Sequence, residues 1–171
     1  MKISKIVKEY PSGKTKQVEY RVNELLHNPN YIVLDEEDLI KVPNKYEYQV
    51  VPGAKAPHAL TTYYESGQLE SITDYFQNKK HGIAQWYFET GEIECESHWF
   101  NNGAHRDPDQ PAFIWWFKSG EIRSRSYWVK ERPVNGPLVS RLNTRPHYIE
   151  YDIQGKILKT SYIDEKGRIY L

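Results

Sequence analysis

The chain of 171 residues carries 23 Lys and Arg against 23 Asp and Glu, a formal net charge of +0. This balance excludes a global basic field for nucleic acid and a strongly acidic field that would mimic it. Hydrophobic residues make up 39% of the chain and aromatic residues 14%, chiefly 14 Tyr and 5 Trp. This composition indicates broad, half-exposed aromatic surfaces rather than a thick aliphatic core.

Cys95 is the single cysteine, which excludes an internal disulfide and fits a reducing compartment. The opening residues, "MKISKIVKEYPSGK", lack the apolar run of a signal peptide. No stretch of the sequence is long and apolar enough for a membrane helix. We therefore expect a soluble, cytoplasmic protein.

The chain opens with a faint repeat, "VKEYPSGKTKQVEYRV", followed by an interruption over residues 23–60 that contains four prolines. Within the interruption, residues 31–34 and 46–51 are predicted strands. The acidic run of Asp35, Glu36, Glu37 and Asp38 is predicted as a solvated loop or helix start, with a cation site or a basic-partner site as the alternative. We interpret residues 1–60 as a degenerate repeat plus an insertion or a cap over the end of a sheet.

Four segments from residue 62 onward share one pattern around a glycine: "TYYESGQLESITDYF", "QWYFETGEIECESHWF", "IWWFKSGEIRSRSYWV" and "YIEYDIQGKILKTSYI". Aromatic residues stand three and four positions before the glycine, except that the last segment has Asp152 at the nearer one. The glycine indicates a turn, because it adopts positive φ at little steric cost. The shared glycines are Gly67, Gly91, Gly120 and Gly155.

After each glycine a strict two-residue alternation begins, as in a strand with two different faces. The first such set, Leu69, Ser71, Thr73 and Tyr75, is large, small, small, large, and we expect it to share one face. Small residues mid-strand leave room for rings from the neighbouring strand. The equivalents are Ile93, Cys95, Ser97 and Trp99; Ile122, Ser124, Ser126 and Trp128; and Ile157, Lys159, Ser161 and Ile163.

Each unit is therefore predicted to be a β-hairpin, and residues 61–171 to form four hairpins. Neighbouring hairpins should pair into an all-β fold, an elongated single-layer antiparallel sheet with an irregular N-terminal segment. The pattern resembles the MORN-variant repeat family over residues 62–171, with a degenerate copy at 8–22. The resemblance implies a binding scaffold without a cofactor. It also implies one described family role, a small antitoxin or immunity protein that occludes a toxin's active site.

The stretch "HRDPDQPA", residues 105–112, spells the catalytic-loop triplet of protein kinases at His105, Arg106 and Asp107. A kinase loop needs an Asn five residues after the Asp, and that position is Ala112; a phosphate-binding glycine loop is missing as well. Connectors between the other repeats have similar composition, and His105-Arg106 aligns with Lys80-His81 and with Glu131-Arg132. We interpret the stretch as a connector between repeats.

Other catalytic or metal sites find little support in the sequence. Cys95 would need His98 or His105 as a base, yet it occupies the small position of Ser71 and Ser124 in sister repeats, which favours packing. The six histidines and the one cysteine show no zinc spacing. We expect no enzyme and no bound metal. The best enzyme hypothesis uses His98, His105, Asp107 and Asp109.

The tryptophans and nearby basic residues are the candidate binding residues, because Trp, Tyr and Arg dominate the cores of protein interfaces. Two other interpretations stay open: the rings stack only on one another, or they stack on single-stranded nucleic acid, which the neutral charge disfavours. The predicted partner-binding residues are Trp86, Trp99, Trp115, Trp116, Trp128, Arg123, Arg125, His105 and Arg106.

The favoured hypothesis is a non-enzymatic module that binds a protein partner, such as a toxin or effector, and not nucleic acid. The alternative is a scaffold for lipid headgroups. It is weaker, because the lysines are scattered among acidic residues and form no basic face. Pairing of exposed edge strands into a homodimer is a further hypothesis.

Overall fold

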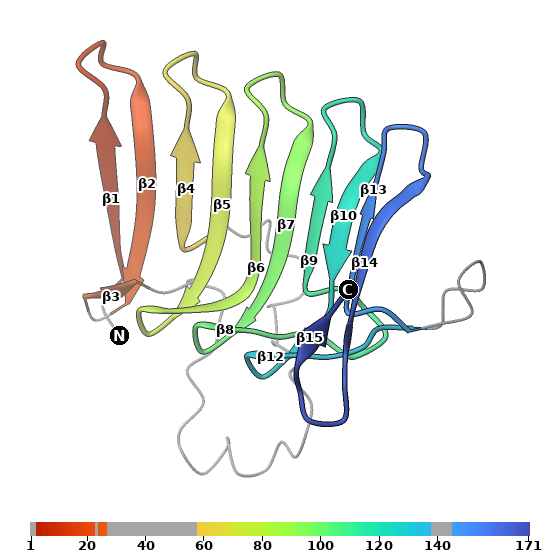
Figure 1. Ribbon diagram of the computed structural model, residues 1–171. Coiled ribbons are helices and arrows are strands. Elements are labelled where there is room, and N and C mark those ends of the chain that lie inside the picture. Colours follow the sequence, from red (N-terminus) through yellow and green to blue (C-terminus); the bar gives the residue numbers. More distant parts are fainter. Residues whose placement is uncertain (1–2, 23, 27–57, 138–144) are drawn as a thin grey trace, which may run out of the picture.

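The computed structural model describes residues 3–22, 24–26, 58–137 and 145–171, and these residues form strands, turns and loops without a helix (Figure 1). A membrane-spanning helix is accordingly not found in the described ranges. The strands predicted at residues 31–34 and 46–51 and the acidic run at 35–38 lie outside the described residues.

The strands form one 13-stranded antiparallel sheet and a separate two-stranded ribbon, β11–β12. The main path through the sheet is β1-β2-β4-β5-β6-β7-β9-β10-β13-β14-β15, with β3 paired to β2 and β8 paired to β7. The strand bounds are β1 Ile3–Glu9, β2 Thr15–Val22, β3 Leu25–Leu26, β4 Leu60–Tyr63, β5 Leu69–Phe76, β6 Lys79–Tyr87, β7 Ile93–Phe100, β8 Gly103–Ala104, β9 Phe113–Trp116, β10 Ile122–Ser126, β11 Trp128–Val129, β12 Arg132–Pro133, β13 Tyr148–Tyr151, β14 Ile157–Ile163 and β15 Ile169–Tyr170.

Figure 1 shows these strands side by side in a single layer, so the predicted fold class is confirmed. The first hairpin, β1–β2, continues the same sheet by pairing with β4. A single layer buries little. Among the described residues the buried hydrophobic ones are Ala59, Ile72, Ala84, Cys95, Ala112, Tyr127 and Ile149.

Five hairpins turn at the same end of the sheet, which we call the glycine-turn end (Figure 1). In the turn at Gly91, Phe88 N–H donates to Glu92 O at 2.9 Å and Gly91 N–H donates to Phe88 O at 2.8 Å. Gly91 has a φ of 101°, where a side chain would be strained. The same pair of hydrogen bonds recurs at Gly13, Gly67, Gly120 and Gly155.

A sixth turn of the same kind, at Gly167, was not predicted from the sequence and lies at the opposite end of the sheet. The sequence does carry a signal for this turn, because Asp164 stands three residues before Gly167 as Asp152 stands three residues before Gly155. Each aspartate accepts hydrogen bonds at Oδ1 from backbone N–H groups two and four residues later, which is how Asp stabilises a turn.

Each glycine-turn hairpin has a β-bulge three residues after its glycine. Tyr63 pairs with Leu69 while Thr62 pairs with Ser71, which leaves Glu70 as the extra residue. Directly paired residues share a face, so Leu69 faces away from Ser71. The prediction that Leu69, Ser71, Thr73 and Tyr75 share one face is therefore wrong for the first residue. The other extra residues are Lys16, Glu94, Arg123 and Leu158.

Two-residue turns with positive φ at both residues lie at the connector end, which is opposite the glycine-turn end, and they are of type I′. They occur at Gln77–Asn78, Asn101–Asn102 and Lys130–Glu131. Aligned on these turns, His105 stands where His81 stands in the preceding repeat. The predicted alignment with Lys80 is thus off by one residue, because the sequence alone did not show which pair of residues makes the turn.

These turns also link successive repeats. Asn102 N–H donates to Lys80 O at 2.9 Å, and Lys80 N–H donates to Asn102 Oδ1 at 2.7 Å. Asn78 makes the same reciprocal pair with Leu26, at 2.9 and 2.7 Å. The asparagines of these two turns, Asn78 and Asn102, therefore extend the strand pairing to the edge of the connector end.

The glycine turns yield a first prediction. A Cβ built on Gly120 meets no atom within 4 Å, so Gly120→Ala tests only the backbone strain at a φ of 98°. We expect a loss of about 1–3 kcal/mol in the free energy of unfolding. Urea denaturation measures it, with the exposed Lys118→Ala in the same turn as the control. Equal stability of the two variants would contradict the assigned turn geometry.

Candidate functional site

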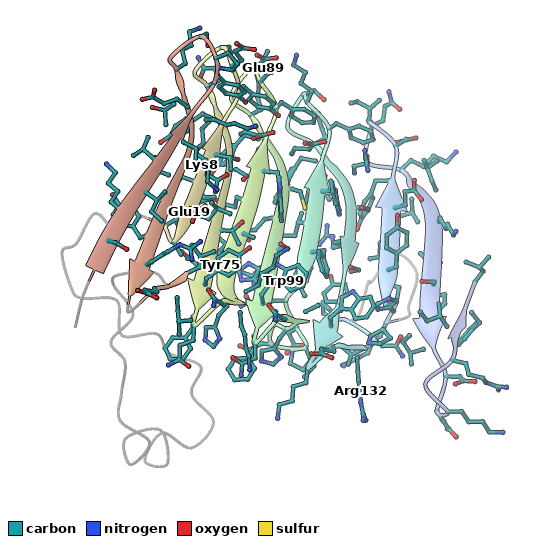
Figure 2. All side chains as sticks on the ribbon, turned by 90° about the vertical axis from the view of Figure 1, so that its left-hand side faces the viewer. Lys8, Glu19, Tyr75, Glu89, Trp99 and Arg132 are labelled. Carbon is teal, nitrogen blue, oxygen red and sulfur yellow. The ribbon has the colours of Figure 1, made fainter. Side chains whose placement is uncertain are left out.

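Four of the five tryptophans lie on one side of the sheet, which we call the tryptophan face: Trp86, Trp99, Trp115 and Trp128. The register defines a row across it, since Trp86 pairs with Cys95, Cys95 with Trp115, and Trp115 with Ser124. Figure 2 labels Lys8, Glu19, Tyr75 and Trp99, which follow one another across the sheet. It also shows Glu89 at the glycine-turn end and Arg132 at the connector end.

Small residues separate the indoles, as the sequence predicted. Cys95 is 1% exposed and Ser124 5% exposed, although no second layer among the described residues covers them. Bulky residues paired beside them shield these positions within the same layer. Ser97 and Ser126, two residues after Cys95 and Ser124, bond the other two indoles. Trp99 Nε1–H donates to Ser97 Oγ at 2.7 Å, and Trp128 Nε1–H donates to Ser126 Oγ at 3.1 Å.

An aromatic chain runs along the tryptophan face near the connector end. The ring of Trp99 meets Phe113 at 5.6 Å between centroids, Phe113 meets Trp128 at 6.4 Å, and Trp128 meets His147 at 5.3 Å. All three pairs are edge-to-face, the geometry that aromatic quadrupoles favour. These contacts hold the rings in defined orientations relative to one another.

Two cations lie over the indoles without a carboxylate partner in the described part of the chain. Lys80 Nζ is 4.6 Å from the Trp99 ring centroid and 5.9 Å from that of Trp86. The Arg123 guanidinium carbon is 5.5 Å from the centroid of Trp115. Cation–π contacts at such partly exposed sites stabilise the fold only modestly.

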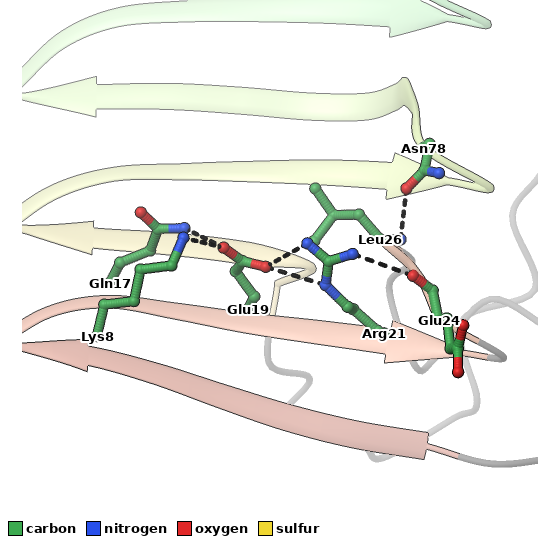
Figure 3. A network of polar contacts seen from close by, with 7 residues as sticks. All are labelled: Lys8, Gln17, Glu19, Arg21, Glu24, Leu26 and Asn78. Carbon is green, nitrogen blue, oxygen red and sulfur yellow. Dashed lines mark hydrogen bonds and ion pairs between the residues drawn. The ribbon is translucent and has the colours of Figure 1, made fainter.

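Next to the tryptophans, the first hairpin places a nearly buried carboxylate on the same face. Glu19 is 5% exposed and accepts hydrogen bonds from Lys8 at 2.8 Å, from Arg21 at 2.8 and 3.1 Å, and from Gln17 (Figure 3). The hydrogen bond from Lys8, together with that from Arg21, holds the pKa of Glu19 below its usual value. Lys8 and Arg21 are thus already paired, unlike Lys80 and Arg123.

Two more of the predicted binding residues, Trp116 and Arg125, lie on the opposite face. Trp116 pairs with Ile122 just across the bulge, in the position that Tyr87 holds in the preceding repeat. Arg125 pairs with Ile149, and its guanidinium lies 5.3 Å from the ring of Tyr151. The structure therefore separates Arg125 and Trp116 from Arg123 and Trp115, although they are neighbours in sequence.

The triplet His105-Arg106-Asp107 is part of the connector between β8 and β9, which confirms its interpretation as a connector. His105 Nδ1 accepts a hydrogen bond from Lys130 N–H at 3.1 Å. Arg106 donates to Pro111 O at 3.1 Å and forms an ion pair with Glu96 at 3.5 Å, on the face opposite the tryptophans. Asp107 is exposed.

Around Glu96 the opposite face holds a polar network. Glu96 accepts hydrogen bonds from Gln85 at 2.8 Å and from His98 at 2.8 Å, and Tyr87 donates to Gln85 at 2.8 Å. Burial opposes ionisation of Glu96, but the hydrogen bonds from His98 and Gln85 lower its pKa. Burial lowers the pKa of His98 too, so its neutral form donates to the carboxylate. The charge of Glu96 is therefore balanced within this network, by Arg106 and by the hydrogen bonds from Gln85 and His98.

An open hollow of about 430 Å³ lies on the opposite face near the first hairpin and was not predicted. Tyr20, Tyr63 and Tyr87 contribute rings, Lys5 contributes a cation, and His58 is bonded to the buried Asp74 at 3.1 Å. Tyr63 and Tyr87 each stand four residues before the glycine of their repeat, which is a sequence signal for this row. The rest of the lining is Val18, Thr61, Leu69 and Ile72.

Exposed large apolar side chains gather at the ends of the sheet. Val7 on β1 is 47% exposed, and Leu158 on β14 is 60% exposed. Strand β1 is an end strand of the described sheet, and β14 pairs with the end strand β15 only at Tyr162 and Ile163. Part of each strand therefore leaves an edge without a described neighbour, which is the feature that allows strand pairing with another chain. Association of two copies through these edges stays a prediction. No group of three His, Cys, Asp or Glu suited to a metal occurs among the described residues.

Residues 59–78 and 80–101 match the family model described as the MORN repeat variant. The two matches coincide with the hairpins β4–β5 and β6–β7, so the suspected MORN-variant resemblance is confirmed there. These two hairpins match MORN repeat variants, and the other glycine-turn hairpins have the same turn and bulge. No curated protein and no solved structure matched the chain.

The packing role of Cys95 yields a second prediction. Burial, followed by the nearby Glu94 and Glu96, raises the pKa of the Cys95 thiol to about 12. The thiolate is the reactive form, so a thiol reagent should modify Cys95 in urea and not in the native protein. Cys95→Ser, which copies Ser71 and Ser124, should keep the fold, whereas Cys95→Leu should cost about 1–3 kcal/mol by overpacking. Fast labelling of the native protein would refute this role.

A third prediction concerns pH. His147 is 4% exposed, and its Nδ1–H donates to Tyr127 O at 3.0 Å. Burial lowers the pKa of His147, so the fold favours the neutral ring. The contribution of neutral His147 to the free energy of unfolding is fully present above the unfolded-state pKa, about 6.5. It is lost as the pH falls through the lower folded-state pKa.

We therefore expect the thermal midpoint of the wild type to fall between pH 7 and pH 5. His147→Gln removes one titrating group and should reduce that fall, although it lowers the midpoint at pH 7. Circular dichroism melts of both proteins at each pH measure the difference. An undiminished fall in His147→Gln would assign the acid sensitivity to other groups, among them His98 and His105, whose pKa values burial also lowers.

Proposed function

We propose that the chain is a non-enzymatic binding module that recognises a protein partner through its tryptophan face. The observation that carries this proposal is the gathering of Trp86, Trp99, Trp115 and Trp128 on one side of a single-layer sheet. Such a concentration of partly exposed indoles is typical of the energetically dominant centre of a protein interface. Lys80 and Arg123 add positive charge to it that has no carboxylate partner among the described residues.

The sheet suits this role because the surface is formed in advance. Hydrogen bonds and edge-to-face contacts already hold Trp99 and Trp128, so binding orders few side chains. A partner then loses less binding free energy to conformational entropy. In the finer form of this proposal the partner is a toxin or effector whose active site the sheet occludes. The family resemblance supports that form.

The fourth prediction separates the two faces. Trp86→Ala combined with Trp115→Ala should abolish capture of a specific partner in a tagged pull-down, because each central indole contributes about 2 kcal/mol or more to such interfaces. Trp116→Ala is the matched control, since it removes an indole from the opposite face. Its capture of the same partner should match that of the wild type.

The proposal fails if the double variant, shown by its urea unfolding to be folded, still captures the partner. It also fails if Trp116→Ala alone loses it, because the working surface would then be the opposite face. Binding of the wild type to anionic vesicles at low salt, abolished at high salt, would support the lipid-scaffold alternative instead.

A further inference from the structure

The strand register sets the distance between the two indoles of the central row. Trp86 lies on β6 and Trp115 on β9, and both pair with Cys95 on the intervening strand β7. Neighbouring strands are about 4.8 Å apart, so two steps across the sheet separate the backbones at Trp86 and Trp115 by about 9.6 Å. Small residues, Ser71 and Ser124, stand on the outer sides of this pair.

One extended peptide conformation repeats at nearly this distance. A polyproline II helix has three residues per turn and a rise of 3.1 Å, which gives a repeat of about 9.3 Å. A proline-rich segment that crosses the strands would therefore place equivalent residues over Trp86 and Trp115 in successive turns. Aromatic-lined surfaces are the usual receptors for such segments, whose restricted backbone loses little entropy on binding.

Hydrogen-bonding capacity distinguishes these two indoles from the others. Trp99 and Trp128 donate their indole N–H groups to Ser97 and Ser126. In the described part of the chain no acceptor is bonded to Nε1 of Trp86 or Trp115, and neither atom is among the buried unpartnered ones. A polyproline II segment makes no internal hydrogen bonds, so its carbonyl groups are free to accept from these donors.

Charge adds a requirement on the segment. Lys80 and Arg123 lie over the indoles and have no carboxylate partner among the described residues, whereas Lys8 and Arg21 on the same face are paired with Glu19. A segment that covers the row brings its own side chains close to Lys80 and Arg123. Carboxylates in it would neutralise both cations, while lysines would be repelled.

We propose that the tryptophan face binds an acidic, proline-rich segment of its partner in the polyproline II conformation, with successive turns on Trp86 and Trp115. This inference rests on the proposed function and specifies the chemistry of the partner. A helical segment satisfies its own backbone carbonyls and would leave both indole donors unused.

The probe is a synthetic peptide with four Pro-Pro-Ala repeats and two glutamates at each end, titrated into the full chain by isothermal calorimetry. We expect saturable binding, and about tenfold weaker binding, or about 1.4 kcal/mol, when glycine replaces each proline. Exchanging the glutamates for lysines should also weaken binding, and salt should reduce that difference.

Variants locate the peptide on the sheet. Trp86→Ala and Trp115→Ala should each weaken binding by about tenfold or more, while Trp116→Ala should leave it unchanged. Trp115→Phe keeps a ring without the N–H donor, so an intermediate loss is expected, and this milder change guards against a variant that fails to fold. Arg123→Gln should weaken binding of the acidic peptide and leave binding of the lysine-flanked peptide unchanged.

The inference is overturned if the proline peptide does not bind, or binds equally to the wild type, Trp86→Ala and Trp115→Ala. If the peptide fails while the combined Trp86→Ala and Trp115→Ala variant still loses the captured partner, the polyproline assignment is wrong and the binding module stands. If neither peptide nor partner depends on these tryptophans, both are wrong. Preference for a helical peptide or for single-stranded DNA over the proline peptide also overturns it.

Discussion

The described residues form one sheet layer with no second layer packed on it, and the rest of their structure depends on this constraint. Every large side chain must be sheltered by neighbours in the same layer, so bulky and small residues alternate across the strands. Cys95 and Ser124 are almost fully buried because indoles lie beside them in the register. The same arrangement leaves the indoles themselves partly exposed, so the residues that stabilise the sheet also form an exposed aromatic patch of the kind that marks interaction sites.

Much of this could be predicted from the sequence, because glycine turns and two-residue alternation are local signals. The alternation from Ser71 to Tyr75 and the pairing of small residues with rings are both confirmed. The bulges could not be predicted, since their extra residues, among them Glu70, Arg123 and Leu158, share no chemistry. Each bulge turns the preceding large residue to the other face, as it does Leu69. The Gly167 turn was missed because its second strand has only two residues.

The candidate site was predicted as one set of residues, and the structure divides it between two faces. Adjacent residues in a strand point to opposite sides, so Trp115 and Trp116 cannot contact one surface together. His105 and Arg106 take part in the connector, where Arg106 is paired with Glu96. What remains on the tryptophan face is smaller and more uniform than the predicted set. Its four indoles, and two cations without a carboxylate partner in the described ranges, are the basis of the proposed function.

The most direct test of that account is the indole N–H spectrum of ¹⁵N-labelled protein, with its five tryptophan signals assigned by single substitutions. On addition of the captured partner, we expect the signals of Trp86 and Trp115 to shift and slow their exchange with water, while that of Trp116 stays in place. A spectrum in which Trp116 shifts and the tryptophan face does not would show that the partner binds the other side of the sheet.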